Sequence, residues 1–196
     1  PLVGEAGAFR RTPNRHDFSI LPPKSTMLDA ISQSGKEVIA IGTITDIFVG
    51  QGITRSTFTH SNTEGMDETM KVLLDKTFTE GLCFTNLVDF DMSWGHRRDP
   101  EGYARGLNAF DGWLKRVLPK LREGDVLMVT ADHGCDPCYL KSTDHTREYT
   151  PLIVYSKGIS PDNFGTRESF ADISATVAEL LGVTLETEGR ALELKN

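Results

Sequence analysis

Positively charged residues are too few in this sequence to outweigh the negative ones. Its 196 residues include 21 lysines and arginines against 28 aspartates and glutamates, a formal net charge of −7, and the isoelectric point is about 5.2. This balance excludes a protein that binds nucleic acid through a generally basic surface. An anionic substrate would instead need local positive charge from metal ions or from a few arginines.

Long apolar runs and cysteines are also scarce. The longest apolar runs, such as Val126–Val129 and Leu152–Tyr155, are far shorter than the roughly 18 to 20 residues of a membrane span. No apolar signal region follows the first residues. Three cysteines cannot all pair, and they do not form the disulfide framework of a secreted protein. We therefore expect a cytoplasmic protein that binds no membrane.

Three motifs that mark common enzyme classes are absent. The sequence holds no G-x-S-x-G nucleophile elbow, no P-loop and no G-x-G-x-x-G dinucleotide fingerprint. Several hydroxyl residues lie near the candidate ligands described below, but no surrounding pattern marks one of them as a nucleophile. They are Ser93, Thr130, Ser142 and Thr143.

What the sequence does contain is an alternation of helical and strand periods. A cap at Ser25 or Thr26 starts a helix that stops at Gly35, and Pro100 suits the first turn of a longer one. Apolar spacing predicts further helices over 62–76, 101–121 and 169–181, and strands over 37–42, 82–90, 125–131 and 151–155.

This alternation predicts an α/β fold, a three-layer sandwich in which helices cover both faces of a mostly parallel sheet. Residues 1–24 show neither period and hold four of the nine prolines. They are expected to be an irregular lead-in to the fold.

Metal-type ligands collect after two of the predicted strands. They are Asp89, Asp91 and His96 after the second, Asp132, His133 and Asp136 after the third, and Asp144 and His145 in the following loop. Because ligands bind at the carboxyl ends of strands in such sheets, we expect these side chains to share a pocket. Carboxylate and imidazole suit Zn²⁺ or Mn²⁺, and two such ions could serve phosphoryl transfer.

Other residues allow different interpretations. Cys135 and Cys138 form a C-x-x-C pair that could be redox-active. Arg97 and Arg98 precede a helix, where they could bind phosphate or pair with Asp99, Glu101 or the site carboxylates. Five further basic residues are expected on the surface, namely Arg10, Arg11, Arg15, His16 and His60.

Longer stretches resemble one family. FTNLVDFDMSWGHRRDPEGY, VTADHGCDP and STDHTREYTPLIVY, with RTPNRHD and IGTITDIFVGQGIT nearer the start, resemble the phosphopentomutases of the alkaline phosphatase superfamily. The resemblance covers essentially the whole chain. It implies an alkaline-phosphatase-like core and an enzyme that moves phosphate between the 1- and 5-positions of ribose or deoxyribose, with a phosphorylated pentose as substrate.

The resemblance also implies the cofactors and the site. Asp91, His96 and His145 resemble the ligands of one Mn²⁺, and Asp132 and His133 resemble ligands of a second, with Zn²⁺ or Mg²⁺ as alternatives. Ribose or glucose bisphosphate is the implied activator. Arg15 resembles a residue that contacts substrate phosphate. Thr43 stands where the family's lysine is expected, which removes a charge-assisted contact to phosphate.

Family members are about twice as long as this chain. We expect residues 1–24 to be the end of a cap domain with its return linker, and residues 25–196 to be the C-terminal part of the metal-binding core. The threonine nucleophile, the N-terminal strands and most of the cap are then expected outside this chain. The missing strands would leave an exposed edge or apolar patch near Val38–Ile41, and the chain alone would have little or no mutase activity.

Two alternatives share the same ligands. One is a phosphatase or phosphodiesterase of the same superfamily, with water as the final acceptor. The other is a catalytically silent metal-binding fragment. The sequence leaves the oligomeric state open.

Overall fold

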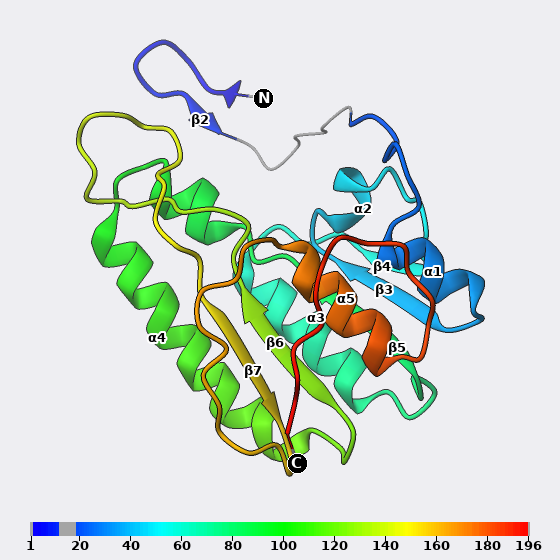
Figure 1. The fold of residues 1–196 in the computed structure, drawn as a ribbon. Helices are drawn as coiled ribbons and strands as arrows, with labels where there is room; N and C mark the ends of the chain where they lie inside the picture. The colour runs from blue at the N-terminus through cyan, green and yellow to red at the C-terminus, as the bar shows by residue number, and fades with distance from the viewer. Residues whose placement is uncertain (1, 12–18, 196) are drawn as a thin grey trace.

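The computed structural model describes residues 2–11 and 19–195, and its central element is strand β3 (Glu37–Ile41). This strand pairs in parallel with β4 (Arg55–Thr57) along one edge and with β5 (Gly81–Thr85) along the other (Figure 1). Val38 packs into a cluster with helices α1 (Met27–Gln33) and α5 (Ala171–Leu180) on one face of the sheet. Ile39 and Ile41 point to the other face, where they join a second cluster with Val72 of helix α3 (Asn62–Leu74). Helices therefore cover both faces of the sheet, and the predicted α/β fold is confirmed.

Helix α1 begins where the sequence predicts. The backbone N–H and the hydroxyl of Thr26 both donate to Asp29, at 2.7 and 2.9 Å, which fixes the first turn. Leu28 and Ile31 are fully buried against β3 and Val177 of α5. Each such apolar side chain contributes about 1.5 to 3 kcal/mol when it leaves water.

Two longer helices pack together in a third cluster. In α3 (Asn62–Leu74) the buried Met66 contacts Trp113 of α4 (Pro100–Val117), whose indole N–H donates to the Met66 carbonyl at 3.0 Å. The single 3₁₀ turn Leu118–Lys120 follows α4, so the helix predicted over 101–121 ends four residues early.

The strands β6 (Val126–Thr130) and β7 (Leu152–Ser156) pair with each other. They run antiparallel, with Met128 opposite Val154. The connection between them holds no helix, and a parallel pair needs a crossover that is usually helical. The three-stranded sheet β4-β3-β5 is therefore parallel, and β6 and β7 form a separate antiparallel pair.

An open edge was expected at Val38–Ile41 or their neighbours, and the structure has it at a neighbour. Residues 38–41 are between 0 and 3% exposed because β3 is central, whereas the adjacent strand β5 lies at the end of the sheet. Strands β5 and β6 contribute Leu82, Phe84 and Met128 to one core. Each of these two strands has one edge that no other described strand occupies, because β5 pairs only with β3 and β6 only with β7. The core-facing residues of β5 and β6 are half-buried.

Some small elements were not predicted. Strands β1 (Leu2–Val3) and β2 (Arg10–Arg11) form an antiparallel hairpin in the segment expected to be irregular. The one-turn helix α2 (Ile44–Ile47) and the exposed strand β4 lack the periods on which the prediction relied. No helix of the described chain is both long enough and apolar enough to cross a membrane.

Candidate metal centre

The site begins where β5 stops. The strand predicted over 82–90 ends at Thr85, and the chain then forms the π-helical turn η1 (Phe90–Gly95). Asp89 holds the start of this turn: it accepts from the backbone N–H of Asn62 at 2.7 Å, and its own N–H donates to the Asn62 side chain at 2.8 Å. This exchange ties η1 to the first turn of α3, so Asp89 has a structural role.

The π turn sets the direction of two candidate ligands. The backbone N–H of His96 donates to the carbonyl of Asp91 at 2.9 Å, a bond that spans five residues. In an ordinary α-helix, residues five apart point about 140° away from one another. The wider turn brings Asp91 and His96 onto one side, and π turns of this kind are frequent at functional sites.

The long loop between β6 and β7 supplies the third side chain. It folds back on itself through a bridge between Gly134 and Thr146, in which the Thr146 N–H donates to the Gly134 carbonyl at 2.9 Å. Thr146 also accepts from the backbone N–H of Asp136 at 2.7 Å. These bonds place His145 beside His133, with ring centroids 3.7 Å apart.

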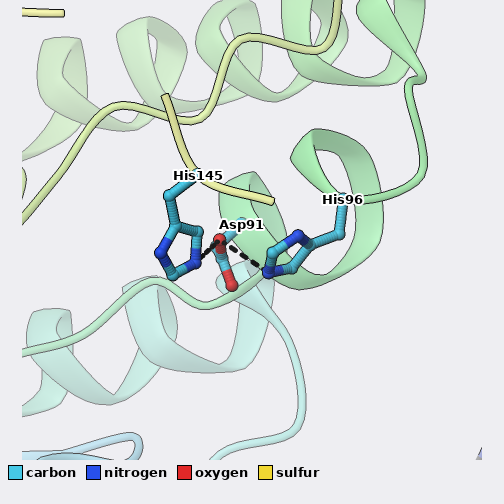
Figure 2. Close-up of side chains that lie close together, drawn as sticks. All are labelled: Asp91, His96 and His145. Carbon is cyan, nitrogen blue, oxygen red and sulfur yellow. Dashed lines mark ion pairs between the residues drawn. The ribbon is translucent and has the colours of Figure 1, made fainter. Parts of the chain in front are cut away.

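Two imidazoles converge on one carboxylate oxygen (Figure 2). The Nε2 atoms of His96 and His145 lie 3.4 and 3.3 Å from Oδ1 of Asp91. One potential ligand atom from each of the three residues lies within 4.8 Å of the other two. The side chains are 28 to 44% exposed, so an ion in solution can reach them.

The donor set fits a divalent metal ion. Oδ1 of Asp91 is buried and has no hydrogen-bond partner among the described residues, which would be costly unless a cation met it. The Nδ1 of His96 lies 2.6 Å from the Thr143 carbonyl, an arrangement that holds the proton on Nδ1 and leaves the Nε2 lone pair free. One carboxylate and two imidazoles suit Zn²⁺ or Mn²⁺.

The other two predicted ligands adjoin this group without entering it. His133 stacks on His145, but its Nδ1 faces the Gly134 carbonyl at 3.1 Å and its Nε2 lies 3.6 Å from Asp132. The Asp132 side chain is 80% exposed. Within the described residues the ligand group is therefore limited to Asp91, His96 and His145.

An aromatic side chain fixes η1 against α4. Trp94 makes an edge contact with Phe90, centroids 5.2 Å apart, and lies over a face of α4 that carries two glycines. A Cβ atom added at Gly106 would overlap the indole ring, and one added at Gly102 would lie 2.5 Å from Cδ1. The lack of side chains at these positions lets the indole sit against the helix backbone.

The remaining predicted acidic residues organise the loops. Asp136 accepts from the N–H of Cys138 at 2.7 Å, and Asp144 accepts from the N–H of His145 at 2.8 Å. Both bonds shape the segment that carries His145.

The basic residues do not follow the expected pairing. Asp99 and Glu101 pair with Arg105, at 3.7 and 3.6 Å, rather than with Arg97 or Arg98. Arg98 has a left-handed backbone with φ of 54°, and its Nη1 is buried without a hydrogen-bond partner. Arg15 and His16 lie outside the described residues.

Thr43 lies just after the carboxyl end of β3 and links it to the chain that follows β5. Its hydroxyl donates to the side-chain oxygen of Asn86 at 2.8 Å, which joins the carboxyl ends of β3 and β5. The hydroxyl that replaces the expected lysine therefore has a structural partner within the chain.

The C-x-x-C pair gains no support as a redox site. Burial, followed by the charge of the Asp91 carboxylate, raises the pKa of the Cys135 thiol to about 11. A thiol with a raised pKa is a poor nucleophile at neutral pH. The prediction from sequence missed that Cys135 contacts the residues of the metal group, because spacing alone does not show which way its side chain points.

Known proteins match this chain closely. A family model described as "Metalloenzyme superfamily" matches residues 11–185. The phosphopentomutase of Lachnoclostridium phytofermentans is 50% identical over 192 residues, 97% of this chain and 48% of that protein. The phosphopentomutase of Carboxydothermus hydrogenoformans is 52% identical over 184 residues, which are 93% of this chain and 47% of that protein. The phosphopentomutase of Clostridium novyi is 47% identical over 192 residues, which are 97% of this chain and 48% of that protein. The chain thus spans about half the length of the curated relatives it matches.

Proposed function

Because the chain belongs to the metalloenzyme superfamily, we propose that it supplies the metal-binding part of a phosphopentomutase. In this proposal the complete protein is an isomerase that moves phosphate between the 1- and 5-positions of ribose or deoxyribose. The names of the relatives support the reaction. The observation that carries the metal part is the approach of two imidazole nitrogens to one unpartnered carboxylate oxygen.

The proposed roles follow the geometry. Asp91, His96 and His145 hold one ion, Mn²⁺ or alternatively Zn²⁺ or Mg²⁺. Asp132 and His133 contribute to a second, and the stacking of His133 on His145 supports its nearness. A divalent ion held there would lower the pKa of a hydroxyl nucleophile and balance charge on the transferring phosphoryl group. Within the chain, the Thr143 carbonyl keeps His96 in its ligating tautomer.

The rest of the enzyme is proposed to lie in polypeptide outside this chain. Residues 1–24 would close a cap domain and lead back to the core formed by 25–196. The threonine nucleophile would come from the other half, so the chain alone would have little or no mutase activity. Its length relative to its relatives supports this, as do the edges of β5 and β6 that no described strand occupies, which could accept further strands. We place the complete enzyme in the cytoplasm, with a sugar bisphosphate activator and Arg15 on substrate phosphate.

Metal binding by the chain tests the first part. Mn²⁺ titrations followed by electron paramagnetic resonance should show one tight site in the wild-type chain. His96→Ala and His145→Ala should each abolish it, whereas His60→Ala should not, because His60 makes an edge contact with Phe58 and is not a member of the group. Equal Mn²⁺ binding by the wild type and both ligand variants would refute the assignment.

Activity of the complemented protein tests the second part. The chain is assayed alone and together with the remaining half of a relative, on ribose 1-phosphate and on an aryl phosphate. The proposal expects conversion to ribose 5-phosphate only in the mixture. Hydrolysis of the aryl phosphate without any sugar isomerisation would favour a phosphatase or phosphodiesterase. Bound metal without turnover in either assay would leave a silent metal-binding fragment.

A further inference from the structure

Cys135 contacts the π-helical turn that carries the metal ligands. A Cβ atom added at Gly95 would overlap the Cys135 sulfur and lie 3.1 Å from its Cβ. The cysteine side chain therefore occupies the space that any larger residue at position 95 would need. Gly95 itself is buried and directly precedes His96. The loop after β6 and the turn η1 thus meet at these two residues.

The thiol also faces the carboxylate of Asp91. The pKa of Cys135 is raised first by burial and then by the negative charge of Asp91, with which the thiol makes a polar contact. Cys135 is not among the residues whose ligand atoms group together, so it stands beside the metal centre rather than in it.

Asp91 has little else to fix its side chain. Its Oδ1 lacks a hydrogen-bond partner, and its approach to His96 and His145, at 3.4 and 3.3 Å, involves nitrogens that a metal would take. Residues behind metal ligands normally hold them in direction, and their loss typically costs about 10- to 100-fold in metal affinity. In this chain the group that faces the ligand Asp91 from behind is the thiol of Cys135.

We propose that Cys135 is a positioning residue of the metal centre, whose side chain packs against Gly95, faces the Asp91 carboxylate and so keeps that carboxylate turned toward the two imidazoles. The inference rests on the proposed metal site. It assigns Cys135 no bond to the metal and no redox chemistry. Cys138, although part of the same C-x-x-C pair, is exposed and lacks this contact.

The test compares Mn²⁺ affinity across four proteins stripped of metal by a chelator: the wild type, Cys135→Ala, Cys135→Ser and the matched control Cys138→Ala. We expect about a tenfold loss for Cys135→Ala. Cys135→Ser should recover most of the affinity because it restores a small polar group, and Cys138→Ala should bind as the wild type does. The spectrum of bound Mn²⁺ should change only in Cys135→Ala. Circular dichroism of the metal-free proteins checks that each is folded.

Each result separates this inference from the metal site itself. Equal affinities and spectra for Cys135→Ala and the wild type, with binding still lost in His96→Ala, would overturn the role of Cys135 and leave the site standing. Absence of Mn²⁺ binding in the wild type would refute both. If Cys135→Ala does not fold, Cys135→Val takes its place: it fills the space beside Gly95 without a polar group and should weaken binding comparably. Unchanged affinity in that variant would refute the inference.

Discussion

Gly106 offers the sharpest test of how helix α4 supports the metal centre. Replacing this glycine with alanine should raise the intrinsic helix stability by about 1 kcal/mol. However, the new Cβ would overlap Cζ3 of Trp94 and lie 2.5 Å from Cη2. Displacing a packed side chain typically costs about 1 to 3 kcal/mol. Gly106→Ala should therefore lower the free energy of unfolding by up to about 2 kcal/mol.

The same helix provides the control. Gly112 also lies within α4, and a Cβ added there meets no atom within 4 Å. Gly112→Ala should stabilise the chain by about 0.5 to 1 kcal/mol. The two alanine variants should thus differ by roughly 1 to 3 kcal/mol in urea denaturation, although they make the same chemical change in one helix.

Metal affinity extends the comparison to the site. Because Trp94 lies in η1 between Asp91 and His96, Gly106→Ala should also weaken Mn²⁺ binding, whereas Gly112→Ala should not. Equal stability and equal Mn²⁺ affinity in the two variants would show that Trp94 can move without cost, and the account of how η1 is supported would be wrong.

Three further predictions concern metal binding, pH and the core. Mn²⁺ at about 100 times its dissociation constant should stabilise the folded chain by about 2.7 kcal/mol in thermal denaturation, and His96→Ala should remove that gain. The Arg190 backbone N–H, followed by the Arg167 guanidinium, lowers the pKa of Asp172 below its ordinary 3.8. The stability from this ionised carboxylate is thus present above that pH and is lost as the pH falls through the lowered value. Asp172→Asn should be less stable than the wild type at pH 7 in urea denaturation, and the difference should shrink toward pH 3; a constant difference would contradict this. Trp113→Phe removes the buried hydrogen bond to Met66 and should cost about 1 to 3 kcal/mol in the same assay, whereas an unchanged midpoint would argue against it.

Local signals explain which parts of the fold could be read from the sequence. The cap at Thr26 and the apolar run over 37–41 each act over a few neighbouring residues, and both elements lie where expected. β4 has only three residues, all exposed, so it carries no period to detect. β5 ends early because the apolar residues after Thr85 enter the turn that leads to η1.

Long-range pairing was harder to predict. The antiparallel partnership of β6 and β7 follows from a connection that never forms a helix, a feature visible in the sequence but outweighed by the alternation elsewhere. The burial of β3 depends on two neighbouring strands, one of which left no signal. Whether a strand is central or lies at an edge of the sheet therefore could not be predicted from the apolar residues of 37–41 alone.

At the site, residue types were more informative than geometry. Carboxylate and imidazole pairs at strand ends pointed to Asp91, His96 and His145, which the structure brings together. The five-residue spacing of Asp91 and His96 gave no sign that a π turn would align them. The neighbourhood of Cys135 could not be foreseen either, because it arises from a contact between segments about 40 residues apart.

Within the described chain, one edge of β5 and one of β6 lack a strand partner, which has a practical consequence for anyone producing this polypeptide. Unpaired backbone donors and acceptors can pair with any nearby strand, and at high expression levels that is another copy of the same molecule. Yield in soluble form should therefore fall as synthesis accelerates, and co-production with the other half of a relative should prevent the loss by occupying both edges first.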